Sequence, residues 1–201
     1  MKLHWSPKSP YVRKVMILVE ELDAANDIEL VRSVAAMTQP NKQLMLDNPL
    51  SKIPTLVLSD GTRLFDSVVI CEYLNDLYKG DFFPSGHQEK WQALQWHALG
   101  DGLLDALILW RNERERAVPL DALLAAFELK TLATLDVLEN EVEDIRASKF
   151  TIGLVSLVCA LGYLDYRFDA LKWRSKAPKL SQWYETIETR LSVHNTLPIE
   201  G

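Results

Sequence analysis

The spacing of hydrophobic and polar positions changes near residue 80. Before that point, short apolar runs are separated by proline, glycine and polar residues. After it, apolar residues recur at intervals of three and four, which is typical of α-helices. The pattern predicts an α/β domain over residues 1–78, a connecting segment over 79–87 and an all-helical domain over 88–201.

The first segments predict a strand–helix–strand unit. Lys2–Trp5 and Asp27–Val31 have the length and composition of short strands, and Tyr11–Leu22 between them shows helical spacing. Two strands joined through a helix normally pair in parallel with a right-handed crossover. Residues 33–50 contain prolines 40 and 49 and are expected to be irregular.

A hairpin is expected next. The apolar runs Thr55–Ser59 and Thr62–Phe65 flank Asp60-Gly61, a dipeptide that suits a two-residue turn with positive φ at both positions. A helix is predicted over Val68–Leu77. The first domain is therefore expected to be a small mixed sheet covered by helices.

Helices alone are expected after residue 87. The predicted helices are 88–116 with a kink near Gly100 and Gly102, 119–147, 152–168, a short helix, and 178–191, followed by a loop over 192–201.

Composition narrows the function classes. The 201 residues include 48% hydrophobic and 25% charged residues, which is ordinary for a globular protein. The net charge of −6 argues against a nucleic-acid surface or a polybasic membrane surface. No apolar segment follows Met1 as in a secretory signal, and the two cysteines lie in apolar stretches. A cytoplasmic protein without a membrane span is expected.

Metal and phosphate motifs are absent. The histidines at 4, 87, 97 and 194 have no zinc-type spacing, and no glycine-rich phosphate loop occurs. We therefore expect no metal site.

Ser9 precedes the first predicted helix, with Pro10 at the first helical position. This is a good N-cap, and a capped helix alone would explain it. The same geometry presents free N–H groups and partial positive charge, so it also suits a bound thiolate.

Two further segments point toward a ligand. Pro54 directly before a strand favours a special turn, a cis peptide among the options, that would leave the backbone groups of Ile53 available to a peptide-like ligand. Asp66-Ser67 opens the next helix. It is either another cap or a pocket in which Asp66 binds an α-ammonium while Ser67 and the helix end bind an α-carboxylate.

In combination these motifs resemble the cytosolic glutathione transferases of bacterial type, and the resemblance covers nearly the whole chain. Three segments carry it: SPKSPYVRKV, NPLSKIPTLVLSDGTRLFDSVVICEYL and FTIGLVSLVCALGYLDYRF. It implies a thioredoxin-like N-terminal domain, an all-α C-terminal domain and a cytoplasmic homodimer. The implied activity is a detoxifying transfer of alkyl or aryl groups to glutathione, without a metal.

The resemblance also implies residue roles. Ser9 would activate the glutathione thiol. The other residues would bind glutathione or line the apolar pocket for the electrophile. The glutathione-binding set is Lys42, Lys52, Ile53, Pro54, Asp66 and Ser67, and the pocket set is Tyr11, Leu104, Leu107 and Trp110.

Two alternatives stay open. One is a glutathione-dependent isomerase or dehalogenase, although the Ser-Ser-Cys stretch of the isomerase class is missing. The other is a non-catalytic scaffold that binds a protein. The family's Ser/Thr-x-x-Asp capping box keeps Thr151 here but has Leu154 in place of the acid, which is expected to weaken the cap.

Overall fold

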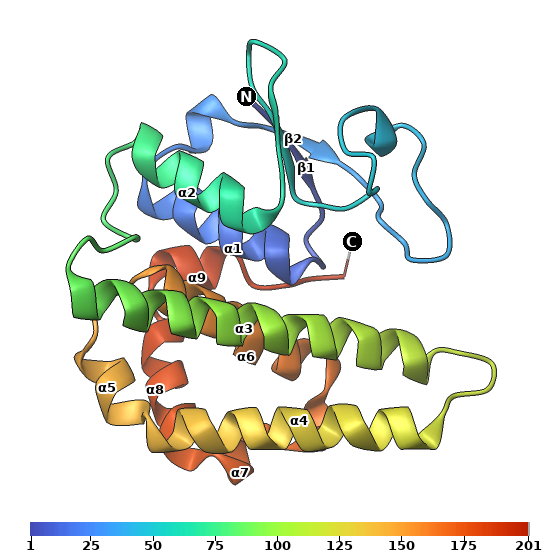
Figure 1. Ribbon diagram of the computed structural model, residues 1–201, viewed down its shortest axis with the longest axis vertical. Helices are drawn as coiled ribbons and strands as arrows, with labels where there is room; N and C mark the ends of the chain where they lie inside the picture. The colour runs from blue at the N-terminus through green and yellow to red at the C-terminus, as the bar shows by residue number, and fades with distance from the viewer. Residues whose placement is uncertain (201) are drawn as a thin grey trace. The chain divides into compact units, whose positions relative to one another are not determined.

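The computed structural model, which describes residues 1–200, has a mixed four-stranded sheet in the spatial order β2-β1-β3-β4 (Figure 1). The strands are β1 (Lys2–Trp5), β2 (Glu29–Arg32), β3 (Thr55–Val57) and β4 (Arg63–Leu64). β1 is parallel to β2 and antiparallel to β3, which is antiparallel to β4. The predicted strand–helix–strand unit with parallel strands is confirmed.

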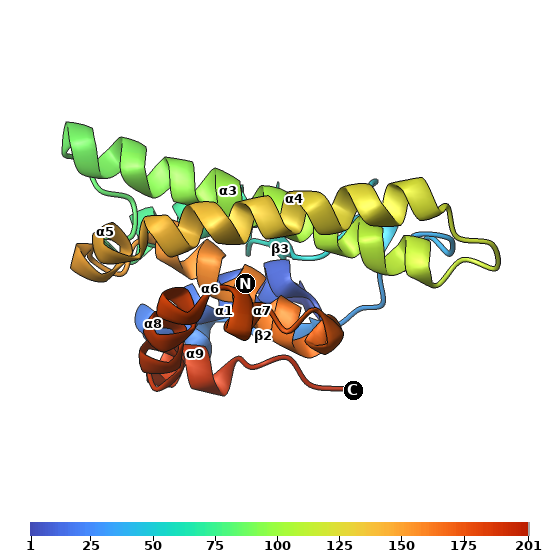
Figure 2. The ribbon, with the colours of Figure 1, turned by 90° about the horizontal axis from the view of Figure 1, so that it is seen from below.

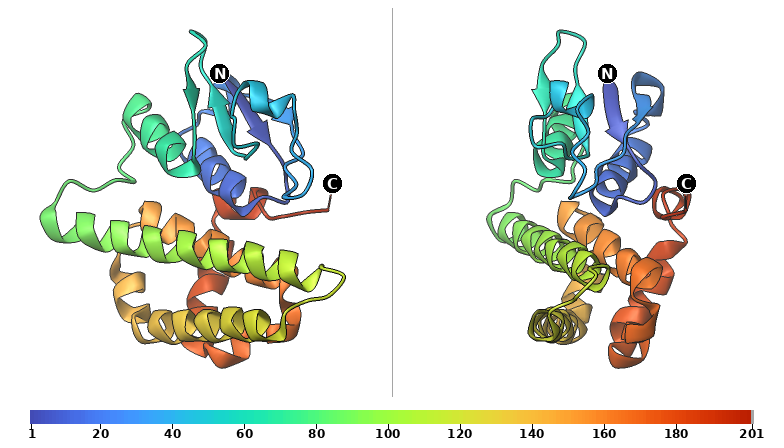
Figure 3. Two further views of the ribbon diagram at one scale, coloured as in Figure 1. Left: turned by 45° about the vertical axis from the view of Figure 1, so that its right-hand side comes forward. Right: turned by 90° about the vertical axis from the view of Figure 1, so that its right-hand side faces the viewer.

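Two helices accompany this sheet. α1 (Pro10–Glu21) and α2 (Ser67–Leu77) pack against each other, and Figure 3 shows them from two directions. Val12, Val15 and Val19 of α1 are almost fully buried at helical spacing, which explains why this segment folds as predicted. Short 3₁₀ turns lie at Ala25–Asp27 and Leu44–Leu46.

The hairpin turn differs from the expected one. Only Gly61 has a positive φ, at 86°, whereas Asp60 does not. The Asp60 carboxylate accepts a hydrogen bond from the Thr62 N–H at 2.8 Å, and Leu58 N–H bonds the Thr62 carbonyl. The aspartate side chain closes the turn itself, so the left-handed conformation is needed only at the glycine.

Helices make up the second part of the chain. Their bounds are α3 (His87–Arg114), α4 (Asp121–Asn140), α5 (Val142–Ala147), α6 (Ile152–Arg167), α7 (Trp173–Lys176), α8 (Pro178–Glu188) and α9 (Leu191–Asn195), with a 3₁₀ turn at Asp169–Leu171. α6 is buried over its first thirteen residues, and α3 packs on both α6 and α4 (Figure 2). None of the helices described is long and apolar enough to cross a bilayer.

α3 is continuous through both of its glycines. At Gly100 the absence of a side chain has a packing role, because a Cβ there would lie 2.7 Å from a backbone atom of Ser156 in α6. Glycine therefore permits the close approach of these two helices.

Two predicted elements were wrong. The single helix expected over 119–147 is two helices that meet at Glu141, whose carboxylate accepts a hydrogen bond from the Trp96 indole at 2.8 Å. The expected terminal loop contains α9, because Val193 is fully buried and its carbonyl accepts a hydrogen bond from Arg13.

Close contacts divide the chain into two units. The first contains Met1–Phe83 together with the C-terminal segment from Ser192, and the second contains Pro84–Leu191.

Candidate functional site

The strand register brings three predicted site segments to one end of the sheet. His4 pairs with Thr55, so the residues after β1 lie beside those before β3. Leu56 pairs with Leu64, so the residues after β4 continue toward the same end. The loop to Ser9, the Ile53 segment and Asp66 therefore share this end, where α1 and α2 also begin.

Ser9 is the N-cap of α1, as its position predicted. Its hydroxyl oxygen accepts a hydrogen bond from the Val12 N–H at 3.3 Å, and its side chain is half-buried. The first turn of α1 carries no acidic side chain, so no charge of its own compensates the positive end of the helix. The position can stabilise an anion.

A cis peptide bond joins Ile53 to Pro54. Pro54 is buried and Ile53 is half-buried. Within residues 1–200, the backbone N–H and C=O of Ile53 make no hydrogen bond to another backbone group. These groups are available to a ligand with peptide-like donors and acceptors.

Asn48 organises this turn, although the sequence pattern did not single it out. Its side-chain nitrogen donates to the Lys52 carbonyl at 3.1 Å and to the Thr55 hydroxyl at 2.9 Å. The Thr55 hydroxyl also donates to the Lys52 carbonyl, and the Asn48 oxygen accepts from the Leu50 N–H. Asn48 is 1% exposed, so water does not compete for these bonds.

Asp66 is the N-cap of α2. One of its carboxylate oxygens accepts a hydrogen bond from the Val68 N–H at 3.0 Å, and the side chain is exposed. The following Ser67 is buried, and the first turn of α2 has no acidic residue. This arrangement offers an exposed carboxylate beside a positive helix end, which suits a ligand that carries both an ammonium and a carboxylate.

Lys42 and Lys52 are exposed in the loop that follows β2. No ion pair of either lysine occurs among the described residues. Both carry charge that can attract an anionic ligand.

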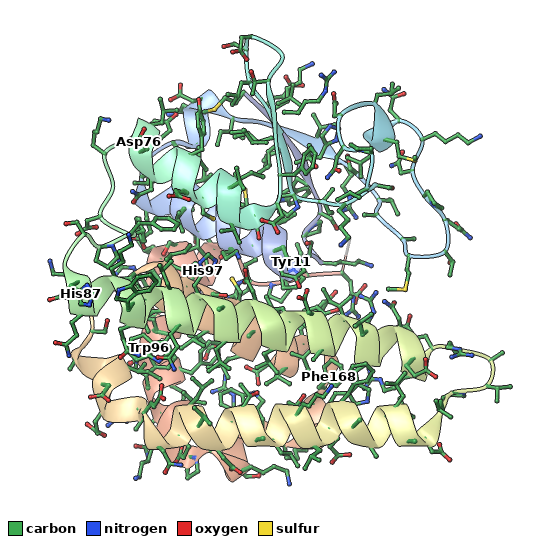
Figure 4. All side chains as sticks on the ribbon, viewed as in Figure 1. Tyr11, Asp76, His87, Trp96, His97 and Phe168 are labelled. Atoms are coloured by element: carbon green, nitrogen blue, oxygen red, sulfur yellow. The ribbon has the colours of Figure 1, made fainter. Side chains whose placement is uncertain are left out.

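The predicted pocket residues lie in two different units. Tyr11 is half-buried in the first turn of α1, where Figure 4 labels it. Leu104, Leu107 and Trp110 are buried on α3. The Trp110 ring lies 4.8 Å from the ring of Phe168, and Figure 4 also labels Phe168.

The loop between β2 and β3 is also held by a polar cluster, which consists of buried His4 and Ser33 and half-buried Asp47. Nδ1 of His4 lies 2.8 Å from the Ser33 hydroxyl, and its Nε2 lies 3.0 Å from the Asp47 carboxylate. The bond with His4 keeps the pKa of Asp47 below its ordinary value, and Arg63 acts in the same direction. No group of three or more metal-ligating side chains occurs among residues 1–200.

The comparisons with known proteins agree with this architecture. Residues 8–77 match the family model described as "Glutathione S-transferase, N-terminal domain". The chain is 32% identical to the uncharacterized GST-like protein YibF of Escherichia coli K12, over 98% of both chains. The chain belongs to the glutathione S-transferase family. The predicted fold, a thioredoxin-like N-terminal domain with a helical C-terminal domain, is confirmed for this family member.

Solved structures of a glutathione transferase family member from Pseudomonas fluorescens Pf-5 resemble this chain closely. One, with bound glutathione, has a TM-score of 0.95 at 39% identity and covers 99% of both chains. Another, with bound S-(propanoic acid)-glutathione, has a TM-score of 0.90 at 38% identity and covers both chains completely. Relatives of this glutathione S-transferase family member thus bind glutathione and a glutathione conjugate.

Proposed function

We propose that this protein is a glutathione transferase that binds glutathione at the shared end of the sheet and activates its thiol with Ser9. The observation that carries the proposal is the convergence there of a capped helix start, an unpaired Ile53 backbone and the Asp66-Ser67 helix start. The glutathione-bound relative from Pseudomonas fluorescens supports it further.

Each part of glutathione then has a partner. The γ-glutamyl group carries an ammonium and a carboxylate, which Asp66 and the Ser67 helix start accommodate. The cysteinyl amide pairs with the Ile53 backbone beside cis-Pro54. Lys52, with Lys42, attracts the glycyl carboxylate.

The thiol lies at the start of α1 in this proposal. A free thiol with a pKa of about 8.5 is only a few per cent ionised at pH 7. A hydrogen bond from the Ser9 hydroxyl and the positive end of α1 both favour the thiolate, which attacks an electrophile held by an apolar pocket. Tyr11, in the first turn of α1, is the residue that we propose for that pocket. The roles of Leu104, Leu107 and Trp110 stay predictions.

Replacing Ser9 by alanine tests the catalytic role. A charge-assisted hydrogen bond is worth about 1.5–3 kcal/mol, so we expect Ser9→Ala to lower the conjugation rate by about 10- to 100-fold. The affinity for glutathione should change little. The pKa of bound glutathione, measured from the ultraviolet absorbance of its thiolate, should rise.

Ser6→Ala is the matched control, because Ser6 lies in the same loop and, within residues 1–200, its hydroxyl makes one long contact, accepted from the Lys8 N–H at 3.4 Å. Thermal unfolding of both variants checks that loss of the Ser9 cap leaves the fold intact. An unchanged conjugation rate in folded Ser9→Ala would remove Ser9 from the mechanism.

Calorimetry tests the binding site separately. Wild type should bind glutathione in the micromolar-to-millimolar range, and Asp66→Ala should bind it much more weakly. A folded wild type that binds no glutathione would refute the proposed function and favour a protein-binding scaffold. Homodimer formation and cytoplasmic location stay predictions, which sedimentation and cell fractionation can test.

A further inference from the structure

His4 of β1 lies at the centre of the polar cluster that holds the loop between β2 and β3. The side chain is buried, and Nδ1 of its ring lies 2.8 Å from the hydroxyl of Ser33, the first residue after β2. Nε2 lies 3.0 Å from the carboxylate of Asp47, which belongs to the same loop. The ring therefore joins the start of the loop to its second half through two hydrogen bonds.

The hydrogen atoms available to this cluster indicate the charge of the ring. The Ser33 hydroxyl donates its one hydrogen to the Val31 carbonyl at 3.3 Å, so toward Nδ1 of His4 it can only accept. The ionised Asp47 carboxylate is likewise an acceptor for Nε2. Both ring nitrogens then carry a hydrogen, which is the protonated imidazolium form of histidine.

The carboxylate of Asp47 stays ionised in this arrangement. The hydrogen bond from His4 keeps the pKa of Asp47 below its ordinary value, and Arg63 of β4, whose Nε lies 3.0 Å from the carboxylate, acts in the same direction. The strand register places the exposed side chains of Lys2 and Glu29 on the same face of the sheet as His4. Among the described residues, the carboxylate within ion-pair distance of His4 is that of Asp47.

Loss of the proton rearranges the cluster, because the neutral imidazole keeps only one N–H. If Nε2 keeps it for Asp47, Nδ1 becomes an acceptor and the Ser33 hydroxyl must turn from the Val31 carbonyl to the ring. One hydrogen bond is then lost, and the bond to Asp47 no longer joins opposite charges, which makes it weaker. If Nδ1 keeps the hydrogen, Asp47 loses its bond to the ring.

The loop depends on such polar contacts because little of it is buried. Within residues 34–47, Leu44 alone is buried. Asp47 directly precedes Asn48, whose side chain bonds the backbone or side chain of residues on both sides of Ile53. A weaker hold on Asp47 therefore lets the segment that presents the Ile53 backbone leave its binding conformation more often.

We propose that His4 is a pH-dependent positioning residue for the glutathione site. Its protonated ring holds the loop between β2 and β3 in the conformation that binds glutathione, and loss of the proton weakens that hold. This inference rests on the proposed glutathione transferase function and adds a regulation to it. Because histidine side chains change charge between about pH 5 and 8, the fraction of the protein with a binding-competent loop should fall as the pH rises through that range.

The glutathione thiol also loses its proton as the pH rises, so the test uses S-methylglutathione, which has no thiol. Calorimetry at about pH 5.5 and 7.5 gives its dissociation constant for wild type, which should rise about threefold between the two. His4→Gln should show a much smaller change, because the glutamine amide can donate to Asp47 but carries no charge to lose. Ionisation of the ligand itself is the same for both proteins and cancels in the comparison.

His194→Gln is the matched control, because His194 is exposed on α9 in the same unit of the chain. It should keep the wild-type change with pH. A role of His4 in stability alone would instead leave the wild-type affinity independent of pH. If His4→Gln does not fold, Asp47→Asn decides, because its uncharged amide removes the ion pair and the change with pH should again be lost.

A wild-type dissociation constant that is equal at both pH values, or a folded His4→Gln that keeps the full change, would overturn this inference and leave the glutathione site as proposed. Failure of wild type to bind S-methylglutathione and glutathione at either pH would overturn both proposals. The two failures are distinguishable, because only the second abolishes binding.

Discussion

The hydroxyl of Thr151 is buried and makes no hydrogen bond among the described residues. Thr151 stands at the N-cap of α6, but its side chain makes no cap hydrogen bond. Leu154, where the family has an acid, is 2% exposed and contributes to the core. Apolar packing of Leu154 therefore takes the place of the hydrogen bond that an acid would make, and the Thr151 hydroxyl makes no cap hydrogen bond.

Thr151→Val should consequently stabilise the protein. Valine keeps the shape of threonine and removes a buried polar group without a partner, which is worth about 1 kcal/mol in the free energy of unfolding. Urea denaturation measures the difference. Thr131→Val is the control, because the buried Thr131 hydroxyl donates to the Phe127 carbonyl at 2.9 Å. That variant should be neutral or less stable, and equal effects of both substitutions would contradict the argument.

Single residues were predictable where their role is local. Ser9 and Asp66 were placed at helix starts because an N-cap depends only on the next three residues. Asn48 was missed because its partners depend on how the chain turns around Pro54. His4 was missed as a loop support because its partner Asp47 is 43 residues away. No spacing rule connects such pairs.

At the scale of elements, the loop between β2 and β3 is held by side chains more than by regular structure. Near the end of this loop, the Asn48 side chain bonds Lys52 and Thr55. In the middle of the loop, the Asn41 side chain bonds Val34, Gln43 and Leu44. Each asparagine side chain makes three hydrogen bonds. Only the Asn48 side chain bonds Lys52 and Thr55, on either side of the Ile53-Pro54 bond, whereas Asn41 bonds this segment through its backbone N–H, which donates to the Ser51 hydroxyl at 2.8 Å.

Asn48→Ala should therefore weaken glutathione binding more than Asn41→Ala does. The Lys52 carbonyl would lose one of its two side-chain donors, so the neighbouring Ile53 backbone would be less well oriented. We expect about a tenfold rise in the glutathione dissociation constant for Asn48→Ala and about twofold or less for Asn41→Ala. Calorimetry gives both values, and similar effects would argue against a specific role of Asn48.

The sequence predicts whether a segment is a helix or a strand better than it predicts where a helix is interrupted. The apolar spacing over 119–147 continues without a break, yet the helix ends at Asn140 and restarts at Val142. The interruption coincides with a tertiary contact that no local spacing indicates, because the intervening Glu141 accepts a hydrogen bond from Trp96 of α3. The turn at Asp60-Gly61 was misjudged for a different reason: the aspartate side chain replaced a backbone conformation.

At the scale of the whole molecule, the end of the chain returns to the unit where it began. Arg13 of α1 is 4% exposed and donates to the carbonyl of Val193, while its other two nitrogens are buried without a hydrogen bond. The Ser192 hydroxyl pairs with the Glu21 carboxylate, and Asn195 reaches Glu20. The first unit is thus completed by the last residues, which the sequence pattern had predicted to be a loop.

Two truncations separate the contributions of this returning segment. Ending the chain at Leu191 removes the buried Val193 and the sole hydrogen-bond acceptor of the Arg13 guanidinium among the described residues. Burial of valine is worth about 1.5–3 kcal/mol and a hydrogen bond to a charged group about as much, so the free energy of unfolding should fall by several kcal/mol.

Ending the chain at Thr196 instead keeps both contacts. It removes the ion pair between half-buried Lys8 and exposed Glu200, and such a pair near the surface contributes about 1 kcal/mol or less. Thermal and urea unfolding should therefore show a large loss for the first truncation and a small one for the second. Equal losses would mean that the terminal residues, and not the α9 contacts with Arg13, stabilise the first unit.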